Sequence, residues 1–160
     1  MELSEIMSAF AAEMGLGSLA PDADGVFHVG IDEMTVSFAE LKDSGLLVTL
    51  AKVCEPPPGT QARLYRVLME AMHMGTATGG AMFSVAPDGE MIYLQRFDAL
   101  KALDYPGFRT MLERFVNVLE QWRRLVAAFR DVAPALNAAG DRDDAEVRQL
   151  GLGQEGMIRG

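Results

Sequence analysis

The stretch VFHVGIDEMTVSFAELKDSGLLVTLAKV, residues 26–53, contains three strand-like runs, at residues 26–31, 34–38 and 45–53. In Met34–Phe38, apolar residues alternate with threonine and serine, which is typical of a strand with one buried face. The run Gly45–Val53 alternates less cleanly, because both of its faces carry apolar residues. The links Asp32-Glu33 and 42–45 are short, so this stretch predicts an antiparallel meander.

Helices and two more strands are predicted on either side of the meander. Apolar residues recur at helical spacing before Gly15, and the prolines at 56–58 stop the third strand ahead of a helix with Thr60 as N-cap. Pro87-Asp88-Gly89 is a hairpin signal, and Pro106 suits the first turn of a long helix that Pro134 ends. The remaining predicted elements are helices at 3–14, 60–74 and 106–132 and strands at 81–85 and 90–97.

These elements predict one α+β domain with the order α-β-β-β-α-β-β-α, in which helices flank an antiparallel, twisted sheet. We place the domain at residues 1–134, a normal length for one hydrophobic core. Residues 135–160 contain few large apolar side chains, too scattered to offset the entropy cost of ordering them. We therefore expect a mobile C-terminal tail.

Charge and composition narrow the class of protein. The formal net charge is −9, and residues 1–60 carry ten acids against Lys42 and Lys52, so nucleic acid is not an expected partner. A single cysteine, Cys54, rules out an internal disulfide and fits a reducing compartment. There is no export signal at the N-terminus and no apolar run long enough to insert into a membrane. These features predict a cytoplasmic protein.

The sequence carries no convincing motif for catalysis or metal binding. His28 and His73 are the two histidines, and nothing in the sequence brings either to Cys54 or builds a zinc site. Glycine-rich residues 75–80 follow a helix, open a strand and lack the lysine of a phosphate loop. A calcium loop starting at Asp22 fails where Phe27 replaces its required glycine. We therefore predict no catalytic residue, no metal and no cofactor.

Methionine is unusually frequent, with 11 residues, and most lie on predicted elements. Methionine fills irregular gaps in cores and is over-used on promiscuous binding surfaces. Any one of them is more simply a core residue, but we expect part of the set to be exposed.

Several segments together resemble one family over residues 1–130. The opening helix ends in MGLGSL and is followed by an acidic Asp-Gly turn and the first two strands. Further segments then come in a fixed order: LYRVLMEA at 64–71, TGGA at 78–81, PDGE at 87–90 and LERFV at 112–116. The order, spacing and acidity resemble class I type III secretion chaperones of the Tir-chaperone type. Two departures are Met72, where the family often has asparagine, and the longer final helix and tail.

The resemblance implies a chaperone without catalytic chemistry or ATP use. It implies a homodimer that holds the N-terminal segment of a secreted effector extended and soluble for the secretion apparatus, whose ATPase is a further implied partner. From the wide apolar stripe of the first helix and from the family groove, we assign effector binding to Leu3, Ile6, Met7, Phe10, Phe27 and Val29. The second helix is apolar around most of its circumference, which with the resemblance assigns the dimer interface to Leu64, Leu68, Met72 and Met82.

Each of these residue assignments, and the function itself, has a simpler alternative. Every effector-binding residue could instead be plain core, and the second helix could be buried within one chain. The protein as a whole could be another dimeric interaction or regulatory module of similar fold, or a small enzyme whose site the sequence does not reveal.

Overall fold

The computed structural model describes residues 2–149, with side chains from residue 2 to 129. Its helices are α1 (Leu3–Met14), α2 (Gln61–Ala71) and α3 (Tyr105–Gln149), with short 3₁₀ turns η1 (His73–Gly75) and η2 (Leu100–Ala102). Its strands are β1 (Phe27–Ile31), β2 (Met34–Leu41), β3 (Leu46–Cys54), β4 (Met82–Val85) and β5 (Ile92–Ala99). The predicted fold class and element order are confirmed.

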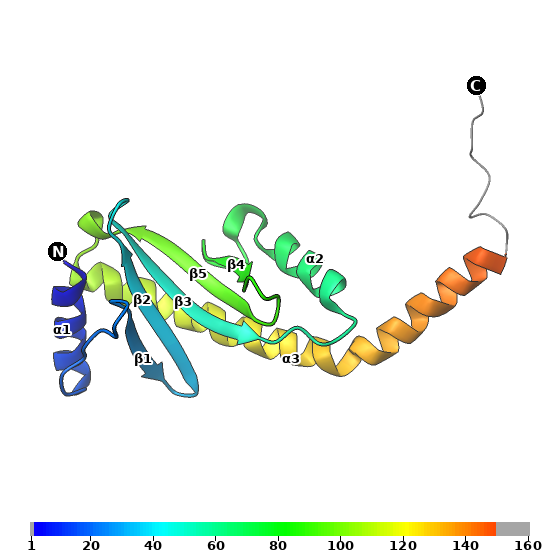
Figure 1. Cartoon of the computed structure of the whole chain (residues 1–160), viewed down its shortest axis with the longest axis horizontal. Helices are drawn as coiled ribbons and strands as arrows, with labels where there is room; N and C mark the ends of the chain where they lie inside the picture. The colour runs from blue at the N-terminus through cyan, green and yellow to red at the C-terminus, as the bar shows by residue number, and fades with distance from the viewer. Residues whose placement is uncertain (1, 150–160) are drawn as a thin grey trace, which may run out of the picture.

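The five strands form one antiparallel sheet in the order β1-β2-β3-β5-β4. Strands β1, β2 and β3 are the predicted meander, and the β4–β5 hairpin closes where Gly89 adopts a φ of 77°, as the Asp-Gly signal predicts. Helix α3 runs along one face of the sheet, and α1 packs beside it (Figure 1). The core therefore lies between this face and the two helices.

Aromatic and aliphatic side chains from the three layers fill the core. Phe108 of α3 meets Phe10 of α1 edge-on at 5.9 Å and Phe38 of β2 at 5.4 Å. Ile6 and Leu119 belong to the same core and are fully buried. Because each aromatic ring touches residues from another element, α1 and α3 are fixed to the sheet by packing rather than by local helix propensity alone.

Helix α3 is longer than the sequence predicts. Its backbone stays helical to Gln149, so the expected stop at Pro134 is wrong. Proline removes one helical hydrogen bond and crowds the preceding turn, which kinks a helix without always ending it. The ribbon of α3 changes direction near its yellow-to-orange part (Figure 1). The mobility of residues 135–160 stays a prediction, and residues 150–160 lie outside the described part.

Helix α2 is shorter than predicted and ends at Ala71 instead of Met74. Met74 has a φ of 58°, which turns the chain out of the helix. Thr60 stands at the N-cap position, but its hydroxyl donates to the carbonyl of Pro57 at 2.8 Å and does not cap the helix. Thr60 therefore occupies the predicted N-cap position, but without a capping hydrogen bond from its side chain.

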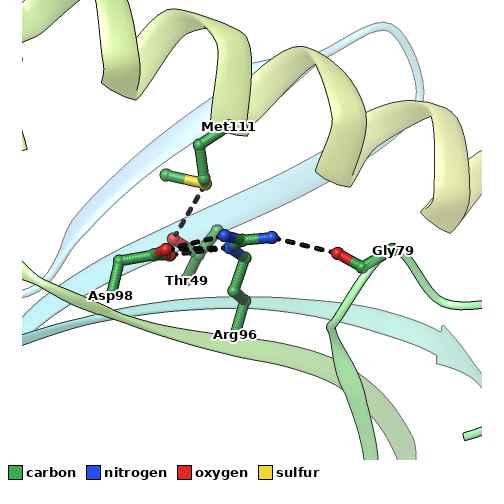
Figure 2. A network of polar contacts seen from close by, with 5 residues as sticks. All are labelled: Thr49, Gly79, Arg96, Asp98 and Met111. Carbon is green, nitrogen blue, oxygen red and sulfur yellow. Dashed lines mark hydrogen bonds and ion pairs between the residues drawn. The ribbon is translucent and has the colours of Figure 1, made fainter. Parts of the chain in front are cut away.

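A polar network holds the glycine-rich connector, residues 75–80, against the core (Figure 2). The Arg96 guanidinium makes two hydrogen bonds of 2.8 Å to the Asp98 carboxylate and donates to the carbonyl of Gly79 at 3.1 Å. The neighbouring carboxylate raises the pKa of Arg96, although partial burial opposes that shift. From α3, the indole of Trp122 donates to the carbonyl of Ala77 at 2.9 Å. The start of β4 is thus fixed from two sides.

Candidate functional site

The first candidate surface, the apolar stripe of α1, is covered in this conformation. All six residues assigned to effector binding are buried, with Ile6 and Met7 fully so and the most accessible at 6% exposure: Leu3, Ile6, Met7, Phe10, Phe27 and Val29. They belong to the main hydrophobic core. Binding at these side chains would require α1 to move away from α3, so their assignment to a groove stays a prediction.

Polar contacts also attach α1 to α3. The Glu13 carboxylate accepts a hydrogen bond from the Tyr105 hydroxyl and forms an ion pair with Arg109. Partial burial and then the hydrogen bond to Glu13 raise the pKa of Tyr105 above its ordinary value of 10.0. The C-terminal half of α1 is therefore tied to the first turns of α3.

The second candidate surface is formed by α2 and β4, where the dimer interface is assigned. Leu64 and Leu68 are buried within the chain itself. Met72 is partly buried, and its sulfur accepts a hydrogen bond from the backbone amide of Phe83 at 3.0 Å. Met82 is 42% exposed. Two of the four assigned residues thus face the core of their own chain, and their place in an interface stays a prediction.

A set of exposed apolar side chains lies on these two elements and on η1 between them. We call it the α2–β4 patch, defined by Val67, Met69, Met74, Met82 and Val85. Three of its five members are methionines, which confirms that part of the methionine set is exposed. Strand β4 is also an edge of the sheet, so the patch adjoins main-chain groups that can pair with another chain.

The third candidate surface is the sheet face opposite α3. In Figure 1, no helix lies in front of β2, β3 and β5 on this side. We call it the open sheet face, and its apolar members are partly or well exposed: Ala39, Leu41, Leu46, Val48, Leu50, Tyr93 and Phe97. A solvated face of an antiparallel sheet is normally polar. The second apolar set of β3, visible in the sequence, therefore lies on a surface suited to binding.

The titratable groups of the described residues form no reaction centre. The His28 ring bonds to the Asp22 carboxylate and to the Ser37 hydroxyl, each at 2.9 Å, in the order of a hydrolytic triad. However, the His28 and Asp22 side chains are 48% and 39% exposed, and a triad needs a desolvated site with oxyanion donors. Within residues 2–129, no cluster of three or more potential metal ligands occurs. His28 instead anchors the loop before β1.

This anchor predicts a pH dependence. The hydrogen bond from His28, then that from the Val26 amide, lowers the pKa of Asp22 below its ordinary value of 3.8. A carboxyl with a lowered folded-state pKa stabilises the fold above its unfolded pKa and loses that contribution as pH falls through the folded value. We expect Asp22→Asn to lower the melting temperature at pH 7 and the difference to shrink below about pH 4. A pH-independent difference in thermal melts would contradict the ionic origin.

The family is identified by its sequence model. The model of the Tir chaperone protein (CesT) family matches residues 5–123, which includes every strand and most of the described helices. The chain therefore belongs to the Tir chaperone protein (CesT) family, and it is a type III secretion chaperone. The resemblance seen in the sequence is confirmed. No curated protein sequence matches the chain significantly.

Solved structures show the same fold at low sequence identity. A chain of the ExsC–ExsE complex superposes with a TM-score of 0.66 and 21% identity, covering 78% of this chain and 96% of its own. A chain of the HopA1–SchA chaperone–effector complex superposes with a TM-score of 0.58 and 14% identity, covering 79% of this chain and 91% of its own. The structure of the Yersinia pestis type III secretion chaperone SycH in complex with a stable fragment of YscM2 superposes with a TM-score of 0.56 and 19% identity. The match covers 74% of this chain and 98% of the matched chain. About a fifth or more of this chain thus has no counterpart in them.

No helix in the described part of the chain is long and apolar enough to cross a membrane.

Proposed function

We propose that this protein is a cytoplasmic, ATP-independent chaperone that binds the N-terminal segment of a type III secreted effector and keeps it extended for delivery. The observation that carries the proposal is the family match over residues 5–123, on a chain whose sheet leaves one apolar face uncovered. An extended peptide can be held by strand addition and by side chains on an apolar surface, without a reaction. The secretion-apparatus ATPase is a further proposed partner.

Co-purification tests this function. Each type III secretion substrate of the source organism is co-expressed as its N-terminal segment with the tagged full chain. We expect one or more segments to co-elute at a fixed stoichiometry and to stay soluble only in the presence of the chaperone. The matched control is the same substrate without its N-terminal segment, which should not co-elute. Failure of every substrate to bind would overturn the proposal.

We propose further that two copies associate through the α2–β4 patch. Met69 and Met74 are 68% and 82% exposed, which is unusual for large apolar residues, and β4 is an edge strand of the sheet. A two-fold axis would place the same patch of both copies in contact. Met82, assigned to the interface from the sequence, lies in this patch, whereas Leu64 and Leu68 would support it from beneath.

Substitution in the patch should separate the copies. We expect the wild type to scatter light as a dimer of a 17.4 kDa chain and Met69→Glu/Met82→Glu to shift it to monomer at micromolar concentration. A charge in an apolar contact weakens association by more than about tenfold, while exposed positions barely affect folding. Leu125→Glu, which is 49% exposed on α3, is the matched control and should remain dimeric. A monomeric wild type would contradict the prediction.

A further inference from the structure

Strands β2 and β3 separate at one end of the sheet. Their pairing ends at Val36 and Ala51, although β2 begins at Met34 and β3 continues to Cys54. The register of β3 against β5 shifts between Lys52 and Cys54, and such a bulge bends and twists its strand. In Figure 1, the end of β3 diverges from the start of β2. The sheet is therefore forked at this end.

The fork opens into a cleft of about 860 Å³, which we call the fork cleft. Its walls come mainly from β2, β3 and α3, with His28 of β1 and Tyr93 of β5, and include Met34, Thr35, Lys52, Val53, Arg123 and Val126. Met34, Val53 and Val126 are buried and form an apolar floor, whereas Thr35 and Lys52 are exposed at the rim. A cleft of this size can hold side chains of a bound peptide.

Main-chain groups at the rim are suited to pairing. If the β2–β3 register continued, Thr35 would stand opposite Lys52, but the pairing stops one step earlier. The facing edges of the two strands thus continue past their last shared pair. Open strand edges are templates for an added strand, which gains main-chain hydrogen bonds. The fork consequently favours an extended polypeptide over a compact small molecule.

The charges of the cleft indicate what such a peptide carries. Arg123 is half-buried, and it donates one long hydrogen bond of 3.5 Å to the carbonyl oxygen of Glu33. Among the described residues, no carboxylate pairs with Arg123 or Lys52. A guanidinium has five donors and pairs bidentately with a carboxylate. Glu33 and Glu55 also line the cleft, so a complementary ligand would carry a single carboxylate directed at Arg123 rather than a run of acids.

The apolar pair Met157-Ile158 of the same chain is a poor occupant. Arg123–Ala127 of α3 lie at the cleft, and Gln149 follows Ala127 by 22 residues, or about 33 Å of helix at 1.5 Å per residue. The nine residues from Gln149 to Ile158 span at most about 32 Å when fully extended. With α3 helical to Gln149, the pair could scarcely reach its own cleft and could not lie along it. The occupant therefore comes from another molecule.

We propose that the fork cleft binds one extended segment of the secreted effector. Its main chain adds to the open edge of β2 or β3, an apolar side chain sits on Met34, Val53 and Val126, and an acidic side chain pairs with Arg123. This subsite rests on the proposed function, since the segment belongs to the same partner. It lies at the forked end of the sheet, where Cys54 of β3 and Val85 of β4 both pair with Ile92 of β5.

Hydrogen–deuterium exchange of the full chain, alone and in complex with a co-purified effector segment, tests strand addition. We expect amides in residues 33–36 and 51–55 to exchange at least tenfold more slowly in the complex. The β2–β3 turn at residues 42–45, at the other end of the same strands, is the internal control and should change little. Unchanged exchange at the fork would overturn the proposal.

Two variants test the side-chain contacts. Thr35→Trp should block the rim and Arg123→Gln should remove the carboxylate partner, and each should weaken effector binding about tenfold in titration calorimetry. Lys42→Trp and Lys101→Gln, exposed and distant from the cleft, are the matched controls and should bind like wild type. Circular dichroism checks folding, and Arg123→Gln keeps the test valid if Thr35→Trp unfolds.

The results separate this proposal from the function it rests on. If the wild type and both fork variants bind an effector equally, the fork cleft is not a subsite, although the chaperone function stands. If the wild type binds no substrate, the function fails and the subsite fails with it.

Discussion

Phe10→Glu should unfold the protein or destabilise it by at least about 3 kcal/mol, rather than produce a stable chaperone that fails to bind. Phe10 is 5% exposed, and its ring packs edge-on against Phe108 of α3 at 5.9 Å. The substitution removes this contact and places a carboxylate in the core. Native domains are stable by only about 5–15 kcal/mol, so a loss of this size can unfold a large fraction of the molecules.

Chemical denaturation followed by circular dichroism measures the effect. Met14→Glu is the matched control, because Met14 lies on the same helix and is 56% exposed. We expect that control to stay within about 0.5 kcal/mol of wild type. A Phe10→Glu protein that melts normally but loses the effector would instead support the groove assignment and show that α1 opens from α3 in solution.

The strands were predictable because their signals are local. Alternation in Met34–Phe38 and the Asp88-Gly89 turn depend on neighbouring residues, and both elements occur where expected. Helix ends were less predictable. The side-chain oxygen of Asp104 accepts a 2.8 Å hydrogen bond from the amide of Gly107, and α3 begins at Tyr105, one residue before the predicted start.

The candidate site was harder to predict than the fold. Periodicity places Ile6 and Phe10 on one face of a helix, but it cannot say whether that face meets a sheet or a partner. The uneven alternation of β3 was the better indication of a binding surface. A strand with apolar residues on both faces buries them only if something packs against each face. The structure provides one cover, α3, and leaves Leu46, Val48 and Leu50 partly exposed. The other face has no cover among the described residues, and the periodicity of one sequence cannot say what would cover it.

Trp122→Ala should cost about 3–5 kcal/mol, the largest loss that we expect from truncating one side chain. Trp122 is 7% exposed, and its ring meets Phe83 of β4 edge-on at 5.1 Å. Its indole also donates to the carbonyl of Ala77, in the glycine-rich connector. Truncation therefore leaves a cavity, removes an aromatic contact and leaves a backbone carbonyl without its donor.

Truncating Trp122 affects the attachment of β4 as well as the packing of the core. The ring joins α3 to the connector and to β4, which is the sheet edge beside the α2–β4 patch. Urea unfolding followed by circular dichroism measures the stability, since Trp122 is the only tryptophan and its fluorescence disappears with it. Trp122→Phe retains an aromatic ring and should lose less stability, whereas exposed Gln121→Ala should stay within about 0.5 kcal/mol of wild type.

If β4 forms part of the dimer contact, Trp122→Ala should also raise the monomer fraction at a concentration where it remains folded. A variant that loses stability but dimerises like wild type would place the contact away from β4.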